Sequence, residues 1–316
     1  MAKNLIARWF DVYRDLGQPI DVHVLRFDQR TQQVLHERYP HTEWDGFSLA
    51  QHLLTQLGWR FHGPRKLRSF SLSLIDKVKA FFHYLHWARI RTTPWRALSA
   101  QRAGEGPAQM HVFSTDWTAK LLIHLEKEAL SLNAWLLYHL HQEASALIVG
   151  GAGTWWLPVD YRPFLGADIG EKNVVSHVAV DLTPKSSGKD IDADIRRRIE
   201  RGDPWAAWTW MNLMARFGKK TMRAILADQL RRNRWCGTMT YMGSWPNRFA
   251  RAPADTPYRF VGVPPAMLGH PIAVGASLML GQLCLGAVIH RSLLEDDAGV
   301  AFFRRYTARL ETSLGT

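Results

Sequence analysis

The sequence has very little cysteine. Its 316 residues include only Cys236 and Cys284, which are far apart and form no Cys-x-x-Cys pair. A disulfide framework or a structural zinc site needs more cysteines at closer spacing. We therefore expect two buried free thiols and neither kind of cross-link.

Long apolar runs are also missing. A membrane-spanning helix needs ~20 apolar residues in a row. The nearest approach, residues 271–289, is interrupted by Gly275, Ser277, Gly281, Gln282 and Gly286. The N-terminus carries early acidic residues and no clean apolar block, so it does not resemble a secretion signal. These absences predict a cytoplasmic protein that is at most peripheral to a membrane.

Several catalytic motifs are absent too. There is no His-Glu-x-x-His and no Gly-x-Ser-x-Gly, which argues against zinc proteases and nucleophile-elbow hydrolases. The glycines of residues 149–156 are not followed by Lys-Ser/Thr, so we predict a turn there and not a phosphate-binding loop. The histidine pairs His83/His86 and His139/His141 lack a carboxylate at matching spacing, and we predict no metal site.

Acidic residues are scarce relative to basic ones, and the net charge is +12. Residues 189–259 hold fifteen Lys/Arg against seven Asp/Glu, so most of the surplus lies there. Such a segment can meet nucleic acid, anionic lipid, the phosphates of coenzyme A or an acidic carrier protein. The alternative is a solvated basic helix face that binds nothing.

The hydrophobic pattern predicts both strands and helices. Alternation of period two predicts strands at residues 20–27, 32–39, 154–163, 173–182, 237–243 and 283–290. Helical spacing predicts helices at 4–15, 48–59, 74–90 and 298–314. A strand and two helices are expected between 112 and 147, the second helix capped by Ser131, and two arginine-rich helices before 237.

The order of these elements indicates the fold class. Hairpins and helices are intermingled, which is typical of an α/β (α+β) protein with mixed sheets. Residues 91–110 contain Thr-Thr-Pro and Gly-Glu-Gly-Pro and are the most linker-like stretch of the chain. We therefore predict two subdomains, residues 1–105 and 106–316.

Residues 40–46, Pro-His-Thr-Glu-Trp-Asp-Gly, join a predicted strand to a predicted helix. They resemble the HHxxxDG signature of the chloramphenicol acetyltransferase-like superfamily, which includes peptide-synthetase condensation domains, wax ester synthases and BAHD acyltransferases. The second histidine falls on His41, and the last two positions on Asp45 and Gly46, while Pro40 replaces the first histidine. Residues 157–182 and 237–243 resemble further stretches of the family. The resemblance implies two subdomains of this fold with an active-site channel between them.

The resemblance assigns roles to particular residues. It makes His41 the general base, a task that suits imidazole because it gains and loses a proton near neutral pH. It makes Asp45, counted with the catalytic set, a carboxylate that fixes the loop by pairing with Arg162. Asn173 braces the same region, although a simple turn asparagine before a strand is an equal alternative.

An oxyanion forms when a nucleophile attacks a thioester carbonyl, so hydroxyl or amide donors should face the base. We predict that Thr240 and Ser244, on or just after the strand at 237–243, supply them. In the basic segment, Arg231 and Arg232 are predicted to bind the donor. No permanently bound cofactor is expected, because the thioester is itself a co-substrate.

The resemblance thus predicts an acyltransferase that uses a thioester of coenzyme A or of a carrier protein and a hydroxyl or amine acceptor. Only 40 residues precede His41 of the motif, fewer than the family usually carries. We expect either a reduced N-terminal half or completion by a partner or second copy. Two alternatives remain: a relative that has lost catalysis and serves as a binding or scaffold protein, and a nucleic-acid-binding protein, although no nucleic-acid motif is present.

Overall fold

The computed structural model describes residues 6–62, 72–88, 92–99, 101–162, 173–232, 235–247, 250–253 and 255–314. Its strands are β1 (Asp21–Asp28), β2 (Gln33–Pro40), β3 (Arg60–Phe61), β4 (Gln109–Val112), β5 (Gly153–Asp160), β6 (Val175–Leu182), β7 (Gly237–Trp245), β8 (Ala250–Arg251), β9 (Tyr258–Val263), β10 (Ile272–Met279) and β11 (Gln282–Ile289). Its helices are α1 (Ile6–Asp15), α2 (Gly46–Gln56), α3 (Leu74–Ala88), α4 (Thr115–Lys127), α5 (Leu132–Ala144), α7 (Gly188–Arg201), α8 (Asp203–Arg216), α9 (Lys219–Arg232) and α10 (Asp296–Thr312).

The larger sheet has the strand order β4-β11-β10-β7-β5-β6. β10 and β11 form an antiparallel hairpin, while β7 runs parallel to β10 and to β5. This hairpin is the apolar stretch at 271–289, and Leu280 and Gly281 at its turn both have positive φ, at 50° and 79°. Positive φ at two consecutive residues is typical of a tight hairpin. Among the described residues, no helix is long and apolar enough to cross a membrane.

The smaller sheet has the order β2-β1-β9, with both pairings antiparallel. β9 lies close across the β10–β11 hairpin, because Gly275 and Gly286 face it without side chains. A Cβ on Gly275 would lie 1.9 Å from the carbonyl oxygen of Gly262 in β9. The pairings β1–β9 and β3–β8 each join a strand that precedes residue 105 to a strand that follows it. The subdomain boundary predicted at residue 105 stays a prediction.

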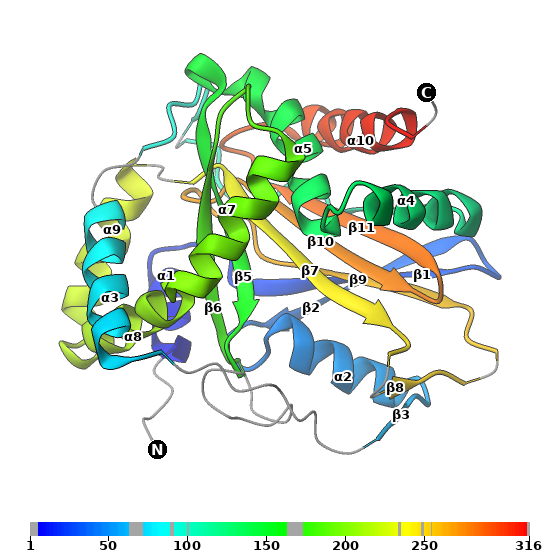
Figure 1. The fold of residues 1–316 in the computed structure, drawn as a ribbon, viewed down its shortest axis with the longest axis horizontal. Coiled ribbons are helices and arrows are strands. Elements are labelled where there is room, and N and C mark those ends of the chain that lie inside the picture. Colours follow the sequence, from blue (N-terminus) through cyan, green and yellow to red (C-terminus); the bar gives the residue numbers. More distant parts are fainter. Residues whose placement is uncertain are drawn as a thin grey trace.

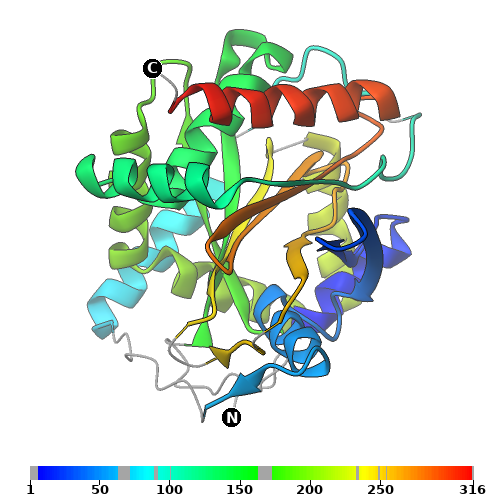
Figure 2. The ribbon, with the colours of Figure 1, turned by 90° about the vertical axis from the view of Figure 1, so that its right-hand side faces the viewer.

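Helices cover the large sheet on one side and at one end (Figure 1). α4, α5, α7 and α10 pack their apolar residues on one face, and α2 and the small sheet lie on the other. Figure 2, a view turned by 90°, shows these two layers on either side of the large sheet. Helix α8 packs beside β6, with α1, α3 and α9 next to it. The hairpin β1–β2, which leads into the motif at residues 40–46, therefore belongs to one layer. Strands β5, β6 and β7 belong to the other.

Most predicted elements are present near the expected residues. The hairpin at 20–39, the helix from residue 74, the cap at Ser131 and both buried thiols are confirmed. The prediction of a linker at 91–110 is wrong at its end, because Gln109 and Met110 begin β4, which pairs with β11. β3, β8, β9 and β10 were not predicted as strands, and three helices, α7, α8 and α9, lie where two were expected. Residues 163–172, part of the stretch that resembles the family, lie outside the described residues.

Candidate active site

The loop at residues 41–45 joins β2 to α2. It is tied at its start by the amide of His41, which donates to the carbonyl oxygen of Ile20 at 3.2 Å. It ends at Asp45, the N-cap of α2, whose side chain accepts hydrogen bonds from the first turn, while the Asp45 amide donates one to the Ser48 hydroxyl oxygen. This reciprocal pair is a capping box, so the local sequence fixes where the helix begins.

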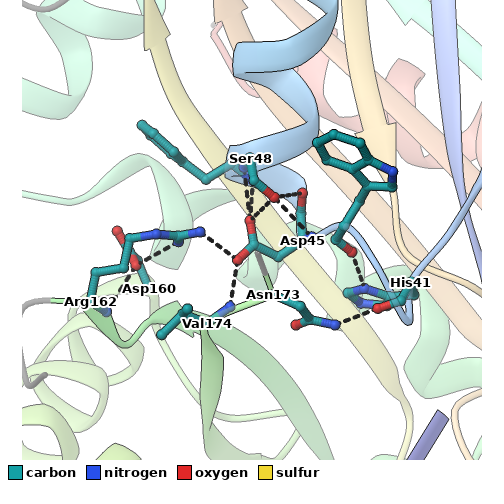
Figure 3. Close-up of polar contacts among 9 residues, drawn as sticks. His41, Asp45, Ser48, Asp160, Arg162, Asn173 and Val174 are labelled. Atoms are coloured by element: carbon teal, nitrogen blue, oxygen red, sulfur yellow. Dashed lines mark hydrogen bonds and ion pairs between the residues drawn. The ribbon is translucent and has the colours of Figure 1, made fainter. Parts of the chain in front are cut away.

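The Asp45 carboxylate is fully buried and accepts hydrogen bonds at both oxygens (Figure 3). Oδ1 accepts from the amides of Phe47 and Ser48, at 3.1 and 2.8 Å, and from the Ser48 hydroxyl at 2.9 Å. Oδ2 accepts from Arg162 Nη2 at 2.8 Å and from the amide of Val174 at 2.7 Å. Asp45 therefore joins the histidine loop to the segments on either side of residues 163–172.

Arg162 and Asn173 complete this support. The Arg162 side chain is fully buried, and its second nitrogen, Nη1, lies 3.0 Å from Asp160 Oδ1. Asn173 donates from its side-chain nitrogen to the carbonyl oxygen of His41. Its φ of 43° is in the left-handed region, which asparagine tolerates. The hydrogen bond agrees with the bracing role that was predicted for Asn173.

His41 has a defined tautomer. Its Nδ1 lies 2.6 Å from the carbonyl oxygen of Trp44, which can only accept, so Nδ1 carries the hydrogen. Burial lowers the pKa of His41 below its usual value, against smaller opposing effects of the Trp44 carbonyl and Asp45. The imidazole is therefore neutral at pH 7, with the lone pair on Nε2. Phe10 from α1 packs on the ring at 4.3 Å between centroids.

His41 lines a cavity of about 620 Å³. Thr240 and Ser244 of β7 line the same cavity, as do Gly46 and Asn173. Its walls are mainly apolar and aromatic, and of the described residues that form them only Asp160 and Arg162 are charged. The remaining wall includes Trp9, Tyr84, Trp156, Trp210, Met211, Trp235, Met242 and Met267. The cavity therefore places a neutral imidazole in a mainly apolar space.

Arg231 and Arg232 are not among the residues that line this cavity. They lie at the end of α9 with exposed side chains, and both contact Asp228, at 2.7 and 2.9 Å. Asp228 offsets part of their charge. Their predicted role in binding a donor stays a prediction, and from this position it would act at a distance.

Sequence reasoning missed three groups at the site. Phe10 belongs to a helix predicted only from its apolar spacing, and nothing local links that helix to residue 41. The Trp44 carbonyl and the Val174 amide are backbone groups, which any residue could supply. Within the described part of the chain, no group of three or more His, Cys, Asp or Glu side chains is arranged to hold a metal ion.

The two larger sheets and the loop that joins β2 to α2 have the chloramphenicol acetyltransferase-like fold, as the motif at residues 40–46 predicted. No protein-family model and no curated protein matches the sequence. Solved structures show the likeness. The epimerization domain from the third module of tyrocidine synthetase B has 15% identity and a TM-score of 0.54, over 93% of this chain and 72% of that one.

Two further structures share the fold. The starter condensation domain of rhizomide synthetase, in complex with C8-CoA and Leu-SNAC, has 13% identity and a TM-score of 0.54, over 99% of this chain and 75% of that one. The trichothecene 15-O-acetyltransferase of Fusarium sporotrichioides has 9% identity and a TM-score of 0.51, over 88% of this chain and 66% of that one. The chain thus has a fold used by condensation and acetyltransferase domains and is shorter than each of them.

Proposed function

We propose that the protein is an acyltransferase that moves an acyl group from a thioester to a hydroxyl or amine, with His41 as the general base. The observation that carries the proposal is the hydrogen bond from His41 Nδ1 to the Trp44 carbonyl oxygen at 2.6 Å. It leaves the basic nitrogen, Nε2, unprotonated on a side chain that lines a cavity of about 620 Å³. The likeness to condensation and acetyltransferase domains supports the same chemistry.

The reaction needs no covalent enzyme intermediate. Nε2 of His41 accepts the proton of the acceptor's O–H or N–H group as that atom attacks the thioester carbonyl carbon. The carbonyl oxygen becomes an oxyanion, for which the hydroxyls of Thr240 and Ser244 are the proposed donors. The intermediate collapses with cleavage of the C–S bond. The imidazolium then returns the proton to the leaving thiolate, so that the products are an ester or amide and a free thiol.

Asp45 has no part in the proton transfer in this scheme. Both of its oxygens are occupied by amides, the Ser48 hydroxyl and Arg162. It holds the loop so that the Trp44 carbonyl and the His41 ring keep their relative positions. The donor thioester, either coenzyme A or a carrier protein, remains a co-substrate and not a resident group.

The test is thiol release from octanoyl-coenzyme A and from octanoyl-N-acetylcysteamine, each offered with a panel of alcohols and amines. We expect His41→Ala to lower kcat/KM by roughly 10²–10⁴-fold, the usual loss for a general base. His62→Ala, at an exposed position away from the cavity, is the matched control and should keep wild-type rates. Normal turnover by a folded His41→Ala variant would remove His41 as the base.

The second candidate, a binding protein without catalysis, is favoured by Pro40 in place of the first histidine of the motif. It predicts that octanoyl-N-acetylcysteamine binds and protects the protein from thermal unfolding, with no thiol released above the uncatalysed rate. Binding of this kind in both wild type and His41→Ala would support it and contradict the acyltransferase proposal.

A further inference from the structure

α3 has a second apolar face that points away from the protein. The helix packs on α8 through Ala80 and Tyr84, which are both buried. Figure 1 shows α3 at the outer edge of the molecule. On the outer side, four large apolar side chains are 49–77% exposed: Leu74, Ile75, Val78 and Phe82.

These four residues form one continuous stripe. At about 100° per residue they fall within an arc of about 100° around the helix axis. Half-buried Phe81 and Leu85 lie within or next to the same arc. Of the eleven large apolar side chains that are exposed in the described residues, four belong to this one helix. A contiguous exposed apolar patch of this kind marks an interaction site and is unusual for a surface helix.

Charge borders the stripe on both sides. By the same helical spacing, Lys77 and Lys79 lie on opposite sides of the arc, and the Lys77 ammonium lies 5.9 Å from the Trp205 ring centre. The one acidic residue of the helix, Asp76, lies outside the arc and accepts a hydrogen bond from Ser73 at 2.6 Å. The exposed Lys79 can bury its methylene stem and extend its charge to anionic head groups, whereas the Lys77 ammonium lies over Trp205 of α8.

We propose that α3 docks the protein on an anionic lipid surface, with its apolar stripe in the boundary between head groups and acyl chains. The stripe contains only Leu, Ile, Val and Phe, which suits the non-directional contact that acyl chains make. It has no Trp, Tyr or Arg, the residues enriched at the hot spots of protein interfaces. At 15 residues the helix is too short to span a bilayer, so it lies in the plane of the surface.

Docking in this orientation places the cavity next to the lipid. Tyr84, on the inward side of α3, lines the cavity that contains His41. Only the thickness of one helix, about 10 Å, would separate the lipid from the cavity wall. This inference concerns a surface, and its test does not depend on the proposed acyl transfer.

The experiment is flotation of the full chain with vesicles of phosphatidylcholine alone and of phosphatidylcholine with an equal part of phosphatidylglycerol. We expect binding to the anionic vesicles that weakens as salt rises. The double variant Ile75→Glu, Phe82→Glu should bind at least about tenfold more weakly, because it places two charges in the stripe. The control is Ile123→Glu on α4, where the side chain is also 66% exposed, and it should bind as the wild type does.

Three results would overturn the proposal. One is absence of binding to the anionic vesicles, and another is equal binding by the double variant and the wild type. The third is a dimer in size-exclusion chromatography that the double variant dissociates, since a second copy would then cover the stripe. Circular dichroism should show the same helical content for all variants, because the substituted side chains are exposed.

Discussion

Asp45 holds the site together because it combines three structural tasks in one carboxylate. It caps α2, it forms an ion pair with Arg162, and it accepts a hydrogen bond from the Val174 amide. A buried charge is tolerated only when its hydrogen bonds are complete, and here both oxygens are satisfied. The position of the neutral His41 imidazole therefore depends on a neighbour that does not touch its ring.

Asp45→Asn should lower the free energy of unfolding by about 3–5 kcal/mol, because it removes the fully buried carboxylate of the two that pair with the buried Arg162. Chemical denaturation measures this loss. Asp160→Asn is the matched control: Asp160 also contacts Arg162, but its side chain is 28% exposed, so a smaller loss is expected. Equal stability of Asp45→Asn and wild type would contradict a structural role for this ion pair.

At the scale of elements, the strands that were hardest to predict include two short ones, β9 and β4. β9 has six residues, and only its pairing with β1 shows why it is a strand. β4 has four residues and no clear alternation, and it forms because β11 offers it a sheet edge. Both depend on partners far along the chain, which local periodicity does not record.

Arg231 and Arg232, at the end of α9, are the residues predicted to attract an anionic donor. The double variant Arg231→Glu, Arg232→Glu should raise the KM for an acyl-coenzyme A donor a few-fold and leave the KM for the acceptor unchanged. The effect should fade as salt rises, since steering acts over about 8–10 Å at ordinary ionic strength. Steady-state kinetics at two salt concentrations measure it.

The control for this change is Arg196→Glu, Arg197→Glu on α7, where both arginines also contact acidic neighbours on their own helix. Similar donor kinetics in the two double variants would indicate a general effect of net charge. Unchanged donor kinetics at low salt, together with lost binding to DNA or RNA, would favour the nucleic-acid alternative.

Across the whole molecule, buried histidines make stability depend on pH. Burial lowers the pKa of four of them by a large amount: His139 and His141 to about 4, and His177 and His270 to about 3. In the unfolded chain each has a pKa near 6.5. Below that pH the unfolded state binds protons that the native state does not, so stability is complete above about pH 6.5 and falls as the pH falls.

We expect the unfolding free energy to decrease from pH 6 to pH 5 by up to about 1.4 kcal/mol for each of these histidines. Denaturation midpoints at several pH values measure the slope. His139→Gln should reduce the slope by removing one of the four titrating groups. A midpoint that is constant from pH 7 to pH 5 would contradict the burial of neutral histidines.

The sequence predicted the fold class and the residues of one loop, for a physical reason. A seven-residue motif fixes a strand end, a turn and a helix cap together, so its chemistry is visible in a short stretch. The resemblance to the family also named Arg162 as the candidate partner of Asp45, and in the structure the side chains of the two residues lie 2.8 Å apart. Phe10 could not be predicted, because its contact with His41 arises from how α1 packs and not from any nearby residue.

The pairing of β1 with β9 also governs the order in which the protein can assemble during synthesis. The loop with His41 leaves the ribosome early, but Arg162, Asn173 and β9 follow much later. Until β9 is made, one edge of β1 has no partner, and an unpaired strand edge invites association with other chains. A chain that stops before β9 would therefore carry the complete motif but could not form the active site.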